Sequence, residues 1–227
     1  MRLINNLGNQ KAALIKFSLD IETQIEKGIR ILRQGGLVAF PTDTVYGLGA
    51  CYNLPDAVEK VYAVKNRPRN MPLPLLLADI LQIAEITGTI PPVARQLIAH
   101  FFPGALTIVL PRSSLVPDVV TAGGATVGIR IPAHPVPVAL AKGLGMPIIG
   151  TSANLSGKPS PLTAAEVHGQ LGNKVDLIID GGRCPGGKES TIIDVTGEIP
   201  VVRREGAIPL AELERICGKV ILAKEVS

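Results

Sequence analysis

The sequence FPTDTVYGL at residues 40–48 follows directly on a run of apolar residues that extends from Gly36 to Phe40. Short apolar runs bounded by glycine are typical of buried strands. Such a strand would end in a loop that carries the hydroxyl groups of Thr42 and Thr44. Two cations come one short helical segment later, and hydroxyls and cations on one rim predict a pocket that binds anions.

The two cations are Lys65 and Arg67, and Pro68 comes directly after them. Proline disfavours the helical conformation in the residue before it, so we expect Arg67 to be extended. Side chains two residues apart on an extended chain face the same way, which would let both cations hold one polyanion. The alternative is a solvated loop whose charges meet only water.

Helical and strand patterns succeed one another along the rest of the chain. Ile21, Ile25, Ile29 and Leu32 recur at helical spacing until Gly35 ends the segment. We expect further helices at residues 55–64, 79–87, 92–101, 135–143, 163–170 and 209–217, and strands at 37–40, 75–78, 105–110, 126–131, 147–150, 176–180, 191–195 and 200–204. Several strands follow one another directly, which predicts an α/β sheet that is partly antiparallel.

The length and hydropathy of the chain indicate one domain. A chain of 227 residues with 46% hydrophobic content can bury a substantial core, and no repeat or linker divides it. We expect a peripheral leader at residues 1–17, a single catalytic domain at 18–218 and a C-terminal tail at 219–227. No run approaches eighteen apolar residues and the N-terminus lacks the pattern of a signal peptide, so we expect a cytoplasmic protein without membrane contact.

Composition restricts the kinds of site. The three cysteines and three histidines are widely spaced, so neither a disulfide framework nor a metal site built from protein side chains is predicted. The net charge of +4 is compatible with a phosphate-rich partner. Aromatic residues make up 3% and tryptophan is absent, which argues against a surface that stacks on successive bases. Any nucleic-acid contact would be chiefly with the backbone.

A second polar loop, Thr151 to Asn154, follows the strand expected at 147–150. On an extended chain Ser152 and Asn154 would share a face, and their hydroxyl and amide groups can donate hydrogen bonds to phosphate oxygens. The carboxyl end of a strand is also where α/β sheets commonly bind ligands. A turn without any ligand is the alternative.

A third loop, residues 180–191, nearly imitates a phosphate-binding P-loop. Glu189 separates Lys188 from the following hydroxyl residues, and the segment after the loop reads as a strand where a P-loop needs a helix. Its glycines would still allow backbone N–H groups to approach an anion, and a plain hairpin turn is the alternative.

Three arginines, Arg130, Arg203 and Arg204, lie at or near the ends of expected strands. Each taken alone fits a surface position, and the hypothesis is that several such ends converge on one cleft. No GxSxG elbow, HExxH motif or carboxylate pair suited to acid–base catalysis is present. Catalysis would therefore depend on positioning and charge neutralisation.

Together these segments resemble the YrdC/TsaC family, the L-threonylcarbamoyladenylate synthases of tRNA modification, in the short form without the extra C-terminal domain. The likeness runs from about residue 20 to 217, and seven motifs in order form a specific signal. They are FPTDTVYGL at 40–48, Lys65-x-Arg67-Pro68, Pro103-Gly104-x-x-Thr107, Arg130-x-Pro132, Thr151-Ser152-x-Asn154, Glu189-Ser190-Thr191 and Arg204-x-Gly206.

The resemblance implies a twisted open mixed sheet, parallel and antiparallel, with flanking helices and a basic concave cleft. There L-threonine, bicarbonate or CO2, and ATP with Mg2+ would form L-threonylcarbamoyladenylate and pyrophosphate. The adenylate would pass to a downstream tRNA threonylcarbamoyl transferase complex, and the basic cleft would offer a contact for tRNA or double-stranded RNA.

The resemblance also implies residue roles. Lys65 and Arg67 match catalytic, nucleotide-binding cations that would restrain the repulsion between carbamate and triphosphate, while Mg2+, held mainly by ATP, screens the leaving pyrophosphate. Ser152, Asn154 and Arg204 match further nucleotide contacts. The threonine pocket is matched by Thr42, Tyr46, Thr121 and Ser190.

Two other functions stay open at this point. A related domain occurs in hydrogenase-maturation carbamoyltransferases, which start from carbamoyl phosphate and carry further segments that are not visible here. A non-catalytic module for structured RNA would use the same basic surface through phosphate contacts, with steeply salt-sensitive affinity.

Overall fold

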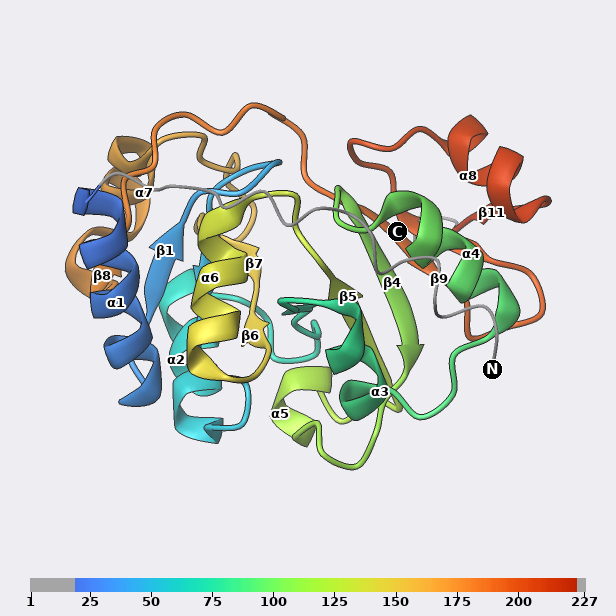
Figure 1. The fold of residues 1–227 in the computed structure, drawn as a ribbon, viewed down its shortest axis with the longest axis horizontal. Helices are drawn as coiled ribbons and strands as arrows, with labels where there is room; N and C mark the ends of the chain where they lie inside the picture. Colours follow the sequence, from blue (N-terminus) through green and yellow to red (C-terminus); the bar gives the residue numbers. More distant parts are fainter. Residues whose placement is uncertain (1–18, 224–227) are drawn as a thin grey trace.

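The computed structural model describes residues 19–223, so the predicted leader at 1–17 and the last four residues of the predicted tail lie outside the described residues. Within the described range the strands form two mixed sheets, and helices flank both of them (Figure 1). The predicted α/β fold with parallel and antiparallel strands is therefore confirmed, with the strands divided between two sheets.

The smaller sheet has the strand order β7-β2-β1-β8. Its members are β1 (Val38–Phe40), β2 (Gly47–Gly49), β7 (Thr151–Ser152) and β8 (Leu177–Ile178). β2 runs antiparallel to both β1 and β7, whereas β8 is parallel to β1. This sheet holds the loop of residues 41–46 between two of its strands.

The larger sheet has the order β11-β10-β9-β4-β5-β3-β6. Its members are β3 (Leu75–Leu76), β4 (Leu106–Pro111), β5 (Thr126–Arg130), β6 (Ile148–Ile149), β9 (Thr191–Asp194), β10 (Val201–Arg204) and β11 (Ile221–Leu222). β4 and β9 are parallel, as are β3 and β5 and also β10 and β11. β11 lies within the predicted tail and pairs with β10 as an edge strand.

Helices flank the sheets at both ends of the view in Figure 1. They are α1 (Leu19–Arg33), α2 (Pro55–Lys65), α3 (Ile83–Ile86), α4 (Pro92–Phe101), α5 (Asp118–Thr121), α6 (Pro135–Leu144), α7 (Ala164–Leu171) and α8 (Leu210–Cys217), with 3-10 turns η1 (Ile80–Gln82) and η2 (Gly172–Lys174). α1 packs on α6, and α4 packs on α8. The longer helices agree with the predicted ranges.

Local chemistry explains where α2 begins and ends. Pro55 stands at the first helical position, where the missing N–H costs nothing. Asn66 ends the helix in the left-handed conformation, with φ of 51°. Lys65 is thus the last helical residue and Arg67 lies beyond the turn, so the two cations are not spaced along an extended segment as the sequence suggested.

Three short strands, β2, β7 and β11, were not predicted. β2 reads Gly-Leu-Gly, and a Cβ atom at Gly47 or Gly49 would lie 2.7 or 2.6 Å from the ring of Phe40 on the neighbouring strand. The glycines therefore make room for this aromatic ring. The chain passes from β6 to β7, and from one sheet to the other, at Gly150, where a Cβ would lie 2.1 Å from Leu76 Cγ.

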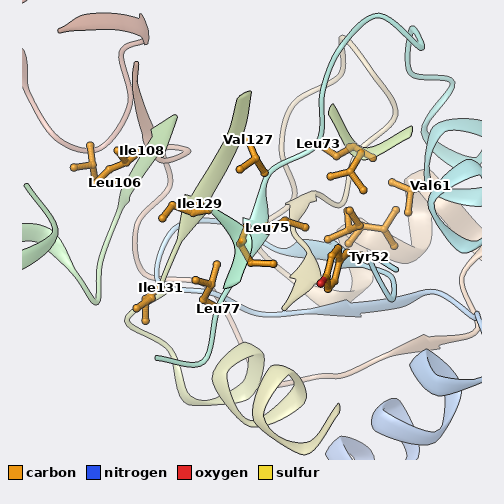
Figure 2. Packing of buried hydrophobic residues seen from close by; sticks show 14 of the residues in the cluster. Tyr52, Val61, Leu73, Leu75, Leu77, Leu106, Ile108, Val127, Ile129 and Ile131 are labelled. Atoms are coloured by element: carbon orange, nitrogen blue, oxygen red, sulfur yellow. The ribbon is translucent and has the colours of Figure 1, made fainter. Parts of the chain in front are cut away.

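The main hydrophobic core draws on strands of both sheets and on the helices that flank them. Figure 2 shows Leu75 and Leu77 beside Ile129 and Ile131, with Val61 of α2 belonging to the same cluster. These five side chains are at most 5% exposed. Among residues 19–223 no helix is long and apolar enough to cross a membrane.

Candidate functional site

One cavity of about 670 Å3 opens where the two sheets meet. Its walls come from the loop after β1, the end of α2, strands β4 and β5, the segment of residues 150–158, the start of β9 and the end of β10. We call it the central cavity. Eight of the nine predicted site residues line it: Thr42, Tyr46, Lys65, Arg67, Ser152, Asn154, Ser190 and Arg204.

Thr121 is the predicted residue that does not line this cavity. It ends the short helix α5, is only 3% exposed, and donates its hydroxyl proton to the carbonyl oxygen of Asp118 at 3.3 Å. Its hydroxyl therefore serves its own helical turn. The structure does not bring Thr121 together with the other predicted residues.

The hydroxyl of Thr42 shapes the loop after β1. It donates to the carbonyl oxygen of Val45 at 2.7 Å and accepts from the backbone N–H of Thr44 at 3.0 Å. The two threonine hydroxyls are also 2.9 Å apart. Since the Thr42 proton is already donated to Val45, Thr44 supplies the proton between the two hydroxyls. Thr42 thus holds the turn that presents Thr44 to the cavity.

Arg130 fixes the same loop from strand β5. Its Nη2 atom pairs with Asp43 Oδ1 at 2.6 Å, its Nη1 donates to Thr44 Oγ1 at 3.0 Å, and its Nε donates to Gly104 O at 2.8 Å. The two charged side chains are 7% and 15% exposed. Burial lowers the pKa of Arg130, and the Asp43 carboxylate opposes that effect. Two of the three contacts of the guanidinium hold the loop after β1 and the third reaches Gly104. Its position at a strand end was the signal in the sequence.

Lys65 is 1% exposed, yet it meets no carboxylate at ion-pair distance in the described chain. Its Nζ atom donates to Ser152 O at 2.5 Å, to Asn154 O at 2.7 Å and to Asn154 Oδ1 at 3.1 Å. Burial, followed by the nearby charge of Arg67, lowers the pKa of Lys65 to about 7, while Glu189 acts in the opposite direction. The buried ammonium therefore holds the 152–154 segment by three hydrogen bonds, and its pKa lies close to neutral pH.

Ser152 and Asn154 face the same way, as predicted. Ser152 Oγ donates to Asn154 Oδ1 at 2.6 Å, and Asn154 Nδ2 donates to Lys158 O at 2.6 Å. Asn154 thereby connects the ammonium of Lys65 to the loop that carries Lys158. Lys158 lines the cavity and, among the described residues, has no ion-pair partner. Ser156 Oγ is also buried in this loop without a hydrogen-bond partner.

Arg67 is held by its own loop. Its Nε donates to Met71 O at 3.1 Å and its Nη2 donates to Pro72 O at 2.8 Å. These bonds leave Nη1 without an acceptor in the described chain, on a guanidinium that lines the central cavity. Burial lowers the pKa of Arg67, and so does the positive charge of Arg204. A cation whose pKa is lowered by a neighbouring cation is suited to sharing an anion with it.

Arg204 is bound to the residues that begin β9. Its Nε and Nη2 donate to Ser190 O at 3.1 and 2.9 Å, and its Nη1 donates to the carboxylate of Glu189. The hydroxyl of Ser190 in turn lies 2.8 Å from Thr107 Oγ1. The pKa of Arg204 is lowered by burial, against the effect of Glu189. β9 is a strand, so the prediction that the 180–191 loop is not a P-loop is confirmed.

Tyr46 lines the cavity, and its hydroxyl contacts the segment around Gly182 rather than the loop that contains Thr42. The side chain is fully buried and Oη donates to Gly182 O at 2.8 Å. Burial, with the added charge of Asp180, raises the pKa of this phenol to about 12. The tyrosine is thus neutral at physiological pH and anchors the 180–190 loop to the cavity wall.

The cavity wall also contains residues that the predicted set did not include. Polar or charged residues among them include Thr44, Thr107, Thr126, Arg130, Lys158 and Glu189. Arg130 and Glu189 belong to motifs of the family resemblance. Their partners, Asp43 and Arg204, lie 87 and 15 residues away along the chain, so local sequence pattern does not predict these contacts. The assembled site holds five cationic side chains and, among its described lining residues, one carboxylate.

Comparisons with known proteins agree with this site. A profile named Sua5_yciO_yrdC, described as telomere recombination, matches residues 30–206. The chain is 44% identical over 207 residues to a Bacillus subtilis protein named threonylcarbamoyl-AMP synthase, covering 91% of this chain and 60% of the relative. A Halorhodospira halophila protein of the same name is 38% identical over 150 residues, covering 66% of this chain and 78% of that relative.

Among solved structures, P. abyssi Sua5 complexed with L-threonine is similar, with a TM-score of 0.87 and 42% sequence identity. The match covers 89% of this chain and 59% of that chain. The chain thus spans about three fifths of the length of the first curated relatives it matches. Every residue that lines the central cavity lies within residues 30–206, the part of the chain that the family profile matches.

Proposed function

The chain belongs to the Sua5_yciO_yrdC family, and on that premise we propose that it makes L-threonylcarbamoyladenylate from L-threonine, bicarbonate or CO2, and ATP, with release of pyrophosphate. This is the activation step that precedes threonylcarbamoyl transfer to an adenosine of tRNA. The relatives named threonylcarbamoyl-AMP synthase support the proposal, and so does the location of the matched segment.

The observation that carries the proposal is the convergence of cations and hydroxyls on one cavity of about 670 Å3. Small-molecule sites of roughly 300–1,000 Å3 are usual, so the space suits a nucleotide with an amino acid. Arg67, Arg204 and Lys158 supply positive charge to the lining, and Ser190, Thr107 and Thr44 supply hydroxyls.

In the proposed reaction the neutral amine of threonine adds to CO2 and loses a proton, which yields a carbamate. A carbamate oxygen then attacks the α-phosphorus of ATP, and the bond from that phosphorus to the β-phosphate bridging oxygen breaks. Pyrophosphate leaves with the electron pair of that bond. The barrier includes the repulsion between a carbamate and a triphosphate, which fixed cations reduce in a dry cavity.

The contacts divide this work among the cations. Within residues 19–223, Arg67 Nη1 and the ammonium of Lys158 have no acceptor, so these two groups would bind the incoming anions directly. Lys65 already gives its three donors to Ser152 and Asn154. Its proposed part is to hold the 152–154 segment and add positive field. Asn154 Nδ2 has a second N–H for a phosphate, and Ser152 Oγ would turn from Asn154 Oδ1 to a phosphate oxygen.

Mg2+ would enter as the counter-ion of ATP. The lining offers hydroxyls, carbonyls and the single carboxylate of Glu189, which is already paired with Arg204. Such a donor set fits a cation held mainly by phosphate oxygens and water, as Mg2+ usually is in nucleotide sites. When bound, the ion would neutralise charge on the leaving pyrophosphate.

The test is an assay of the purified full chain with threonine, bicarbonate and Mg-ATP. We expect pyrophosphate release that requires threonine, and an adenylate of the corresponding mass. Release that requires carbamoyl phosphate instead would support the hydrogenase-maturation type of chemistry. No release, together with salt-sensitive binding of structured RNA, would support the RNA module.

The proposal also includes what receives the product and whether the protein contacts RNA. The product would go to a tRNA threonylcarbamoyl transferase in the cytoplasm, because a carbamoyl adenylate hydrolyses unless a partner consumes it. Direct contact of the basic cleft with tRNA is tested by the same RNA titration, carried out with and without saturating ATP.

A further inference from the structure

Glu189 is the one carboxylate among the described residues that line the central cavity. Its Oε1 accepts a hydrogen bond from Ser160 Oγ at 2.5 Å, and its Oε2 accepts from Arg204 Nη1. The charge of this carboxylate also raises the pKa values of Lys65 and Arg67 against the burial that lowers them. An acidic side chain therefore stands among the cations of a site that we propose for anionic ligands.

The carboxylate satisfies the same donors that a phosphate oxygen would. A hydroxyl and a guanidinium N–H converge on it, and both groups bind phosphate as readily as carboxylate. Arg204 has no other acceptor for Nη1 among the described residues. Because Nη1 carries two N–H groups, a phosphate that binds there either accepts from the second one beside the negative charge of Glu189, or displaces the carboxylate.

The side chain can leave without disturbing the fold. The ion pair is half-exposed, with 40% of the Arg204 side chain and 30% of the Glu189 side chain accessible, and such pairs contribute little to stability. The backbone is fixed on both sides, since Ala207 N donates to Glu189 O at 2.8 Å and Thr191 N donates to Ala105 O at 3.0 Å. Exchange would thus be a rotation of one side chain rather than a movement of the loop.

We propose that Glu189 is an internal competitor for phosphate, which occupies a phosphate position on Arg204 in the free protein and must rotate away when a phosphate group binds. This inference rests on the proposed function, because the ligand is taken to be the polyphosphate of the nucleotide. Its consequence is weaker retention of pyrophosphate, the product that must leave. The carboxylate would return to Arg204 and Ser160 as pyrophosphate departs.

The first test is pyrophosphate binding, measured by calorimetry on the full chain without ATP or threonine. Glu189→Gln keeps an oxygen acceptor for Ser160 and removes the charge. We expect it to bind pyrophosphate about tenfold more tightly, because a like charge beside the ligand is removed. Glu205→Gln is the matched control: it changes the net charge equally, is exposed and does not line the central cavity. We expect it to change the affinity less than about twofold.

The second test is a crystal structure of the unmodified chain with pyrophosphate. We expect pyrophosphate on Arg204, with Glu189 rotated away from Arg204 and Ser160. The inference is overturned if the ion pair persists beside bound pyrophosphate, or if Glu189→Gln binds equally or less tightly, which would make Glu189 a positioning group for Arg204. It is also overturned if both glutamine variants tighten binding alike, or if neither variant nor the unmodified chain binds pyrophosphate.

These outcomes are distinct from a failure of the proposed function. Threonine-dependent pyrophosphate release by the unmodified chain tests the function without any variant. The function can therefore stand while the competition fails. Conversely, tightening in Glu189→Gln without turnover of threonine would keep the competition and refute the proposed substrate. Thermal unfolding of both glutamine variants confirms that each is folded.

Discussion

The ammonium of Lys65 donates to both the main-chain and the side-chain oxygen of Asn154, at 2.7 and 3.1 Å, across a separation of 89 residues. The last residue of α2 is thereby joined to the loop after β7. Because Asn154 also reaches Lys158 O, one buried cation determines the position of a whole wall of the central cavity. The first predictions follow from this contact.

Replacing Lys65 by methionine should impair catalysis more than stability. The change takes a donor from three oxygens, of which Asn154 Oδ1 keeps the hydroxyl of Ser152. The loss at the two main-chain oxygens costs about 1–3 kcal/mol, while the change removes the penalty of a buried charge. We expect kcat/KM for threonine-dependent pyrophosphate release to fall at least about 100-fold. Urea unfolding and steady-state kinetics measure the two effects.

Lys60→Met is the matched control for that experiment. Lys60 lies on the same helix and donates to Gly35 O at 2.8 Å, but it does not line the cavity. We expect its kcat/KM to stay within about threefold of the unmodified chain. Equal losses of activity in the two variants would show that the helix, and not the cavity cation, matters.

Lys65 should also give the protein a characteristic pH dependence of stability. Its pKa is lowered from 10.5 to about 7 in the folded chain, so between these values the unfolded chain binds the proton that the native chain has released. Stability rises with pH wherever the unfolded state binds more protons. The contribution of Lys65 should therefore increase by about 2 kcal/mol from pH 7 to pH 9.

The measurement is the free energy of unfolding of the unmodified chain minus that of Lys65→Met, at pH 7, 8 and 9. Taking the difference cancels the tyrosines and cysteines, whose raised pKa values act in both proteins. A difference that stays constant over this range would contradict the assignment of a depressed pKa to Lys65.

The ion pair between Arg130 and Asp43 should be the more costly one to break. Its side chains are 7% and 15% exposed, and removing one partner of a buried pair costs about 3–5 kcal/mol. We expect Asp43→Asn to lower the free energy of unfolding by about 3 kcal/mol, since the amide keeps one hydrogen bond. Activity should fall as well, because the same arginine positions Thr44.

Asp118→Asn provides the comparison. Asp118 also pairs with an arginine, Arg112, but 77% of its side chain is exposed. We expect a loss below about 1 kcal/mol in the same urea experiment. If the two variants lose equal stability, burial does not govern these pairs.

Much of this site followed from the sequence, for a physical reason. Strand ends and the loops beside them bring Thr42, Ser152 and Arg204 to one cavity, and the end of α2 brings Lys65 there. Apolar runs fix the strands and the helix, so the polar residues at their ends have few possible locations. Local pattern does not encode which donors find which acceptors. The three oxygens on Lys65 and the carboxylate on Arg204 come from other segments of the chain.

The features that the sequence did not predict correctly each have a physical reason. β2 and β7 are short, and the glycines of β2 are there to accommodate Phe40, which is a tertiary requirement that strand propensity does not contain. Thr121 was taken as a cavity residue, but its hydroxyl is used within α5. The cations at residues 65 and 67 do reach one cavity, through a helix end and a left-handed Asn66 rather than an extended segment.

Arg67 should be the cation whose loss acts most directly on anion binding. Its Nε and Nη2 donate to Met71 O and Pro72 O, which orient the guanidinium so that Nη1 meets no acceptor in the part of the chain that the structure describes and is available to a ligand. Arg67→Lys keeps the charge but cannot make both loop bonds and a ligand bond in the same planar geometry. We therefore expect Arg67→Lys, which loses the guanidinium geometry, to bind ATP about tenfold more weakly. We expect Arg67→Ala, which loses the charge as well, to bind ATP about 100-fold more weakly.

Arg69→Ala is the control, since Arg69 pairs with Glu59, is 67% exposed and does not line the cavity. Calorimetry with ATP measures the three affinities, and equal binding by Arg67→Lys and the unmodified chain would show that charge alone, without the fork of the guanidinium, suffices at this position.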